Sequence, residues 1–173
     1  TLYNGEMAFK VIADHIKAVT FALADGANFG NTGRDYVLRR LVRRSIRFGK
    51  KLGFEEPFLY KLVPVVVRVM GEAYPEIKEH SGEIAVYILD EEKLFMNTLE
   101  DGERRLKEII ATTKGKVISG YDAFKLYDTF GFPLELTIEI AKEQGYDVDS
   151  DGFNEYMEKQ RLLAKKSNRS KTA

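Results

Sequence analysis

The 173-residue sequence has no cysteine, which excludes a disulfide framework and any zinc site built on cysteine thiolates. The lack of cysteine also fits a reducing compartment, and we expect a cytoplasmic protein. Long hydrophobic runs are missing as well, because the longest, residues 62–67, is far shorter than the roughly 20 residues of a membrane-spanning helix. The composition therefore argues against a secreted disulfide-rich domain and against a membrane partner.

Histidine is scarce, since the chain holds only His15 and His80. Neither has a second histidine or a cysteine at the spacing of metal ligands, so we predict no metal site. His15 adjoins the apolar side of an expected helix, where packing is a simpler role than general-base catalysis. Carboxylates cluster at Glu91–Glu92 and around residues 100–103, and we expect both clusters on a solvated helix surface. The sequence therefore predicts no catalytic residues.

A nucleotide-binding loop is also missing. Gly26, Gly30 and Gly33 match neither the P-loop nor the dinucleotide-binding fingerprint in spacing, and no strand precedes them. We interpret residues 25–31 as a simple loop. No secretory or transit signal opens the chain, which does not begin with Met, and we expect it to be a segment of a longer protein.

The charges balance overall but are distributed unevenly. There are 27 basic and 27 acidic side chains. Residues 34–51 hold eight basic residues and one acid, whereas residues 72–108 hold eleven acids and five basic residues. Such asymmetry steers an anionic ligand toward one face of a protein.

The arginines of residues 31–47 recur at helical spacing, so they predict a ridge of guanidinium groups along a helix whose other side is mostly apolar. Like charges four residues apart destabilise an isolated helix by a few tenths of a kcal/mol per pair. Their repetition therefore favours a bound polyanion, although a solvated face or an acidic protein partner also fits. The arginine ridge consists of Arg34, Arg39, Arg40, Arg43, Arg44 and Arg47.

Apolar residues keep helical periodicity throughout, so we predict an all-α fold. It is a helical bundle of about six to seven helices, with one long helix in the middle and a smaller C-terminal helical subdomain. Residues 1–115 form the subdomain with the arginine ridge, and residues 116–173 form the C-terminal subdomain with a frayed tail. The expected helices span about 6–24, 32–53, 56–70 with a kink or break at Pro64, 77–112, 120–127, 133–145 and 152–166.

Helix ends are marked by polar residues. Thr32, with Asp35 three residues later, predicts a capping box at the start of the Arg-rich helix. Asp149 or Ser150 is expected to cap the last helix. Asn31 and Asp128 also suit simple turn or cap roles. Their polar groups equally suit the edge of a base, because an amide both donates and accepts hydrogen bonds and a carboxylate accepts them.

Several ordered motifs resemble the alanyl-tRNA synthetase family. They are VIADH at 11–15, ADG at 24–26, NTGRDYVLRR at 31–40 and LYDTFGFP at 126–133. Glu91, Glu92, Phe95 and Gly102 fit the same pattern, as do Phe153, Met157 and Gln160. Thr32 and Asp35 depart from it, because the family usually has Glu and Gly there. The resemblance covers nearly the whole chain and implies the family's helical middle region, which recognises the tRNA acceptor stem.

The resemblance implies alanine tRNA as partner, with no DNA expected, and a role in reading the G·U wobble pair of its acceptor stem. It assigns that base pair to Asn31 and Asp128, because wobble geometry leaves a guanine amino group from which a carboxylate can accept. The arginine ridge would bind the RNA backbone. The parent enzyme would use ATP with magnesium, and zinc in its editing domain. This segment lacks the ATP-binding arginine motif of class II synthetases and the His/Cys zinc ligands of an editing site. It should therefore bind RNA without a cofactor and without catalysis.

Overall fold

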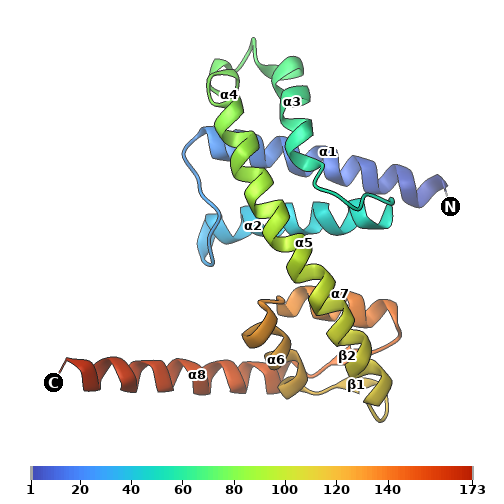
Figure 1. Cartoon of the computed structure of the whole chain (residues 1–173), viewed down its shortest axis with the longest axis vertical. Helices are drawn as coiled ribbons and strands as arrows, with labels where there is room; N and C mark the ends of the chain where they lie inside the picture. The colour runs from blue at the N-terminus through green and yellow to red at the C-terminus, as the bar shows by residue number, and fades with distance from the viewer. Residues whose placement is uncertain (1, 173) are drawn as a thin grey trace. The chain divides into compact units, whose positions relative to one another are not determined.

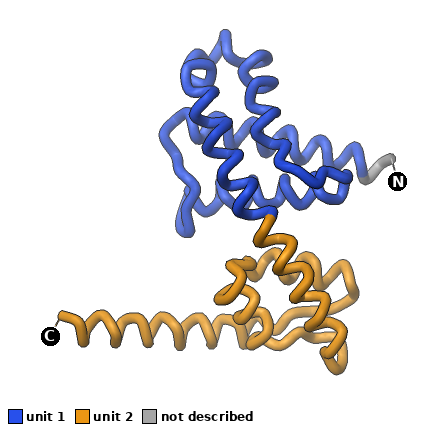
Figure 2. The backbone as a smooth tube through the Cα atoms, viewed as in Figure 1, with its two compact units in different colours: residues 1–96 blue, residues 97–173 orange. Residues whose placement is uncertain are grey.

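The computed structural model describes residues 2–172 and divides into two compact units, residues 1–96 (unit 1) and 97–173 (unit 2), shown in Figure 2. The predicted all-α class is confirmed. The described residues form eight α-helices, one short 3-10 helix and two strands of two residues each (Figure 1). Over the same residues, no helix combines the length and the apolar character needed to cross a membrane.

Unit 1 is built around a pair of packed helices, α1 and α2, with α3 and α4 lying against α1. Its core consists of apolar side chains that recur at helical spacing, such as Ile12, Ile16 and Val19 on α1, each less than 5% exposed. Phe9, which follows the same spacing, is 57% exposed. The elements are α1 (Leu2–Ala24), α2 (Gly33–Lys51), η1 (Leu59–Leu62), α3 (Val63–Met70), α4 (Pro75–Glu79) and the first part of α5 (Ser81–Thr112).

Two expected helices of unit 1 are interrupted. The break foreseen near Pro64 separates η1 from α3, and the proline occupies the first turn of α3, where its missing N–H is not needed. The long helix expected over 77–112 is divided at His80, which ends α4 just before α5 begins. This second division explains why the described residues contain one helix more than the expected maximum of seven.

Unit 2 contains the end of α5 and three further helices joined by a minimal sheet. β1 and β2 pair in parallel, Val117 with Asp147 and Ile118 with Val148. Strands of two residues are too short to show an alternating pattern, so periodicity could not predict them. The helices and strands are β1 (Val117–Ile118), α6 (Gly120–Phe130), α7 (Leu134–Glu143), β2 (Asp147–Val148) and α8 (Ser150–Lys171).

The last helix begins as predicted and ends later than predicted. Asp149 is its N-cap, and its Oδ1 accepts a hydrogen bond from the Gly152 N–H at 3.0 Å. The helix continues to Lys171. The frayed tail expected after about residue 166 stays a prediction.

Close packing ties the end of α5 to unit 2. Gly102 of α5 lies against the ring of Phe132, which is 0% exposed, and a Cβ atom at this glycine would overlap the ring. This contact explains why unit 2 includes a part of α5 that the sequence placed in the N-terminal subdomain.

α6 ends at a glycine in the left-handed region, Gly131, whose φ is 66°. The N–H of Gly131 donates to the carbonyl of Tyr127 at 3.0 Å, and the N–H of Phe132 donates to the carbonyl of Leu126 at 3.1 Å. The helix therefore runs three residues beyond the predicted end at 127. As a consequence, Asp128 lies in its last turn rather than in a loop or at a cap.

Candidate nucleic-acid interface

The outer side of α2 carries exposed arginines: Arg34, Arg40 and Arg44. Among the described residues, Arg34 and Arg40 have no hydrogen-bond or ion-pair partner. The guanidinium of Arg44 lies 5.7 Å from the ring centre of Phe48 on the same helix. Exposed guanidinium groups of this kind can bind phosphate oxygens through two parallel N–H groups.

The inner arginines of the ridge are turned toward protein. Arg39 and Arg43 keep 19% and 20% of their side-chain exposure, and Arg47 is 6% exposed. The Nε of Arg39 lies 2.9 Å from Glu91 Oε1, and the Nε of Arg43 lies 3.6 Å from the same oxygen. The Arg43 guanidinium also lies 5.0 Å from the ring centre of Phe95. Residues that share one helix thus have two different environments.

Glu91 and Glu92 are not on a solvated surface, and that prediction is wrong. They are 6% and 0% exposed. Glu91 compensates the charges of Arg39 and Arg43, whereas Glu92 accepts three backbone N–H groups at the start of η1. Burial raises the pKa of Glu92, and these three hydrogen bonds together with Lys61 oppose the rise.

Asn31 lies in the loop just before α2 and is exposed. Its Oδ1 accepts a hydrogen bond from Nη1 of Arg39 at 2.9 Å. The residue is therefore neither a helix cap nor a freely rotating surface side chain. One of its two polar atoms already has a partner in the protein.

The predicted capping box is absent. Thr32 occupies the N-cap position, but its side chain accepts no cap hydrogen bond. Asp35 instead fastens the loop before the helix, because its Oδ1 accepts from the N–H of Asn28 at 3.4 Å and its carbonyl accepts from the N–H of Gly30 at 3.2 Å. The two residues that depart from the family pattern therefore do not interact as a capping pair.

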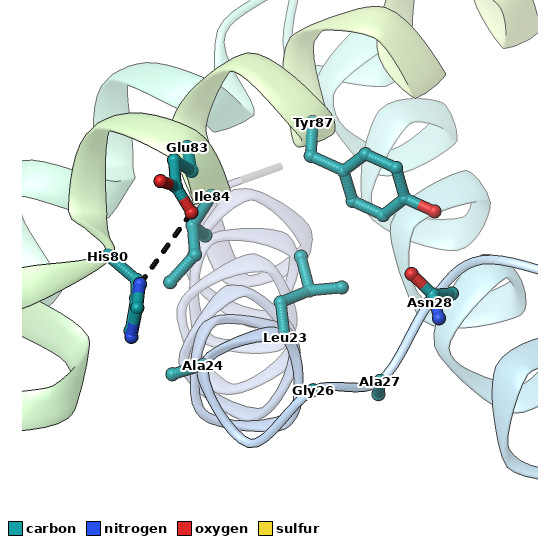
Figure 3. Close-up of a pocket in the computed structure, with 9 residues that line it drawn as sticks. All are labelled: Leu23, Ala24, Gly26, Ala27, Asn28, His80, Glu83, Ile84 and Tyr87. Carbon is teal, nitrogen blue, oxygen red and sulfur yellow. Dashed lines mark ion pairs between the residues drawn. The ribbon is translucent and has the colours of Figure 1, made fainter.

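The same loop is anchored to α5 by Tyr87. The Phe29 N–H donates to the Tyr87 hydroxyl at 3.1 Å, and the two rings stack with centres 5.0 Å apart. Tyr87 also lines a hollow of about 460 Å³ between the end of α1 and the start of α5 (Figure 3). The Nδ1 of His80 lies 3.6 Å from a carboxylate oxygen of Glu83 there (Figure 3). None of the site residues predicted from the sequence lines this hollow.

Asp128 lies in unit 2 and is exposed near the end of α6. Its Oδ1 accepts a hydrogen bond from Nε2 of Gln160 on α8 at 2.8 Å. The neighbouring Tyr127 ring meets Phe153 edge to face, with centres 5.9 Å apart. The aromatic residues next to Asp128 thus include a contact between α6 and α8.

His15 is half-buried on α1. Burial lowers its pKa below the ordinary value of 6.5, and the positive charge of Arg44 lowers the pKa further, while Asp14 raises it. The imidazole is therefore neutral at neutral pH. Among residues 2–172, no group of three or more His, Cys, Asp or Glu side chains could hold a metal ion.

Comparison with known proteins identifies the family of this helical chain. The model of the family described as tRNA synthetases class II (A) matches residues 2–173. The chain belongs to that family. Its relatives confirm the resemblance to alanyl-tRNA synthetases that the motifs indicated.

These relatives are much longer than the chain. An alanine–tRNA ligase of Bacillus anthracis is 56% identical over 163 residues, which are 92% of this chain and 18% of the relative. An alanine–tRNA ligase of Ligilactobacillus salivarius is 55% identical over 165 residues, which are 94% of this chain and 19% of the relative. The chain therefore spans less than a fifth of the length of the curated relatives it matches.

Proposed function

We propose that this chain is the tRNA-recognition segment of an alanine–tRNA ligase and that it binds the acceptor stem of alanine tRNA in the cytoplasm. Membership of the synthetase family and the identity to alanine–tRNA ligases support the proposal. ATP-dependent attachment of alanine, with magnesium, and zinc-dependent editing belong to other parts of the enzyme. The described residues offer no cluster of metal ligands, so we assign neither ion to them.

Asn31 and Asp128 recognise the G·U wobble pair in this proposal. The observation that carries it is that both side chains are exposed while one oxygen of each is already bound by a donor of the protein. Oδ2 of Asp128 can accept a hydrogen bond from a guanine amino group. The amide nitrogen of Asn31 can donate one to the same base pair.

The outer arginines Arg34, Arg40 and Arg44 bind phosphates in this proposal, since their exposed guanidinium groups match phosphate geometry. Such contacts set affinity and register without reading sequence. The phosphate contacts expected of the inner arginines stay predictions.

The test is aminoacylation of acceptor-stem microhelices by the intact ligase that contains this segment. Asn31→Ala and Asp128→Ala should each lower the ratio of kcat/KM for a G·U stem over a matched A·U or G·C stem. A lost base-edge contact costs about 1–3 kcal/mol, so the ratio should fall by about 5- to 150-fold. Arg40→Ala is the matched control and should weaken all three stems alike.

Salt dependence provides a second measurement. By analogy with B-form DNA, loss of one phosphate contact should make the dependence of log Kd on log salt concentration shallower by about 0.9 in Arg40→Ala. The slope should be unchanged in Asn31→Ala. If neither Asn31→Ala nor Asp128→Ala alters the selectivity ratio, this chain does not read the wobble pair through these residues.

A further inference from the structure

Arg39 connects a buried carboxylate to an exposed amide. Its Nη2 donates to Oε2 of Glu91 at 3.4 Å, and its Nε lies 2.9 Å from Oε1 of the same carboxylate as an ion-pair contact without hydrogen-bond geometry. Its Nη1 donates to Oδ1 of Asn31 at 2.9 Å. The three residues therefore form a chain of contacts from α5 through α2 to the loop before α2.

The contact defines which way the Asn31 amide faces. An arginine side chain has only donors, so the atom of Asn31 that it touches is the carbonyl oxygen. The amide nitrogen is then directed away from Arg39, and it has no partner among the described residues. An exposed asparagine without such a contact could present either atom outward.

The Glu91 end of this series of contacts is held inside the protein. Glu91 is 6% exposed, and Arg43 lies 3.6 Å from the Glu91 oxygen that also contacts Arg39. Arg39 is itself only 19% exposed. A largely buried guanidinium held by an ion pair and a hydrogen bond to a buried carboxylate has little rotational freedom, so we expect the Asn31 amide that bonds to it to be ordered before any ligand arrives.

We propose that Arg39 and Glu91 are positioning residues for base-pair recognition. They orient the Asn31 amide so that its N–H groups donate to an acceptor on the edge of the base pair. The inference rests on the proposed function, and it gives Arg39 a role different from phosphate binding. Arg39 acts through Asn31, whereas its neighbour Arg40, one of the outer arginines, contacts the RNA backbone directly.

The first experiment replaces each arginine by lysine in the intact ligase. Arg39→Lys keeps the charge but loses the planar guanidinium group that contacts both Glu91 and Asn31. It should lower the G·U selectivity ratio by about five- to tenfold, which corresponds to about 1 kcal/mol lost because the Asn31 amide is less well oriented. Arg40→Lys should change activity on all stems alike and leave the ratio constant. Glu91→Gln, which retains one carbonyl acceptor for Arg39, should lower the ratio by a smaller factor.

The decisive measurement is a double-mutant cycle. If Arg39 acts through Asn31, the double variant Arg39→Lys with Asn31→Ala has the selectivity ratio of Asn31→Ala alone. Losses that multiply overturn the inference, because Arg39 then contacts the RNA by itself. A ratio that falls in Asn31→Ala but not in Arg39→Lys also overturns it and leaves the proposed function intact. A ratio unchanged in both Asn31→Ala and Asp128→Ala refutes the proposed function itself.

Discussion

Glu92 should be among the most important side chains for the stability of unit 1. It is fully buried on α5. Its Oε2 accepts from the N–H groups of Phe58 and Leu59 at 2.9 and 3.0 Å, and its Oε1 accepts from that of Tyr60 at 2.8 Å. Phe58 precedes η1 and provides no side-chain cap, so a carboxylate from a distant part of the sequence satisfies the first donors of η1.

The size of the effect follows from the number of hydrogen bonds lost. A hydrogen bond to a charged group contributes about 1.5–3 kcal/mol, and a buried donor left without a partner costs about 1–3 kcal/mol. Phe58 and Leu59 are buried, whereas Tyr60 is half-buried and can reach water. Removing the cost of burying a carboxylate offsets part of the loss. We therefore expect Glu92→Ala to lower the free energy of unfolding by about 3–5 kcal/mol.

The assay is urea unfolding of the chain, monitored by circular dichroism. Glu92→Gln keeps one carbonyl acceptor and should lose about 1–3 kcal/mol. Asp90→Ala, an exposed change on the same helix, should stay within about 0.5 kcal/mol of the parent. A loss below about 1 kcal/mol in Glu92→Ala would refute the view that Glu92 stabilises η1.

Two further predictions concern stability. Because burial raises the pKa of Glu92 above its ordinary value of 4.5, the folded state binds this proton more tightly than the unfolded state. The difference in free energy of unfolding between the parent and Glu92→Gln should therefore fall as pH rises from about 4.5 through the raised pKa, and a difference that grows would contradict the assignment. Gly102→Ala should lower the free energy of unfolding by about 1–3 kcal/mol, because the added methyl group overlaps a buried ring. Its control Gly82→Ala, with open space around the position on the same helix, should be neutral or stabilising by up to about 1 kcal/mol in the same urea titration.

Most helices could be predicted from local sequence. Ile12, Ile16 and Val19 recur at the spacing of one helix face, and each is buried in the structure. Proline marked the interruption near Pro64 correctly, because the restricted φ of proline is a property of a single residue. Local chemistry therefore sufficed for the class of fold and for the approximate elements.

The surroundings of the candidate site could not be predicted in this way. Spacing placed Arg39 and Arg40 on one ridge, yet only Arg40 faces solvent without a protein partner among the described residues. Glu91 and Glu92 looked like ordinary surface carboxylates. A charged side chain is buried only where a partner compensates its lost hydration, and here the partners lie more than 30 residues away in the sequence.

The sequence alone determined the helical class, the family and the two polar residues that we assign to base-pair recognition, since periodicity and motifs are local properties of the chain. The tertiary structure decided how those residues are oriented. Gln160 bonds to Asp128, and Arg39, fixed by Glu91, bonds to Asn31. Such contacts depend on which helices pack together, because hydrogen bonds form only between atoms that folding brings within about 3 Å.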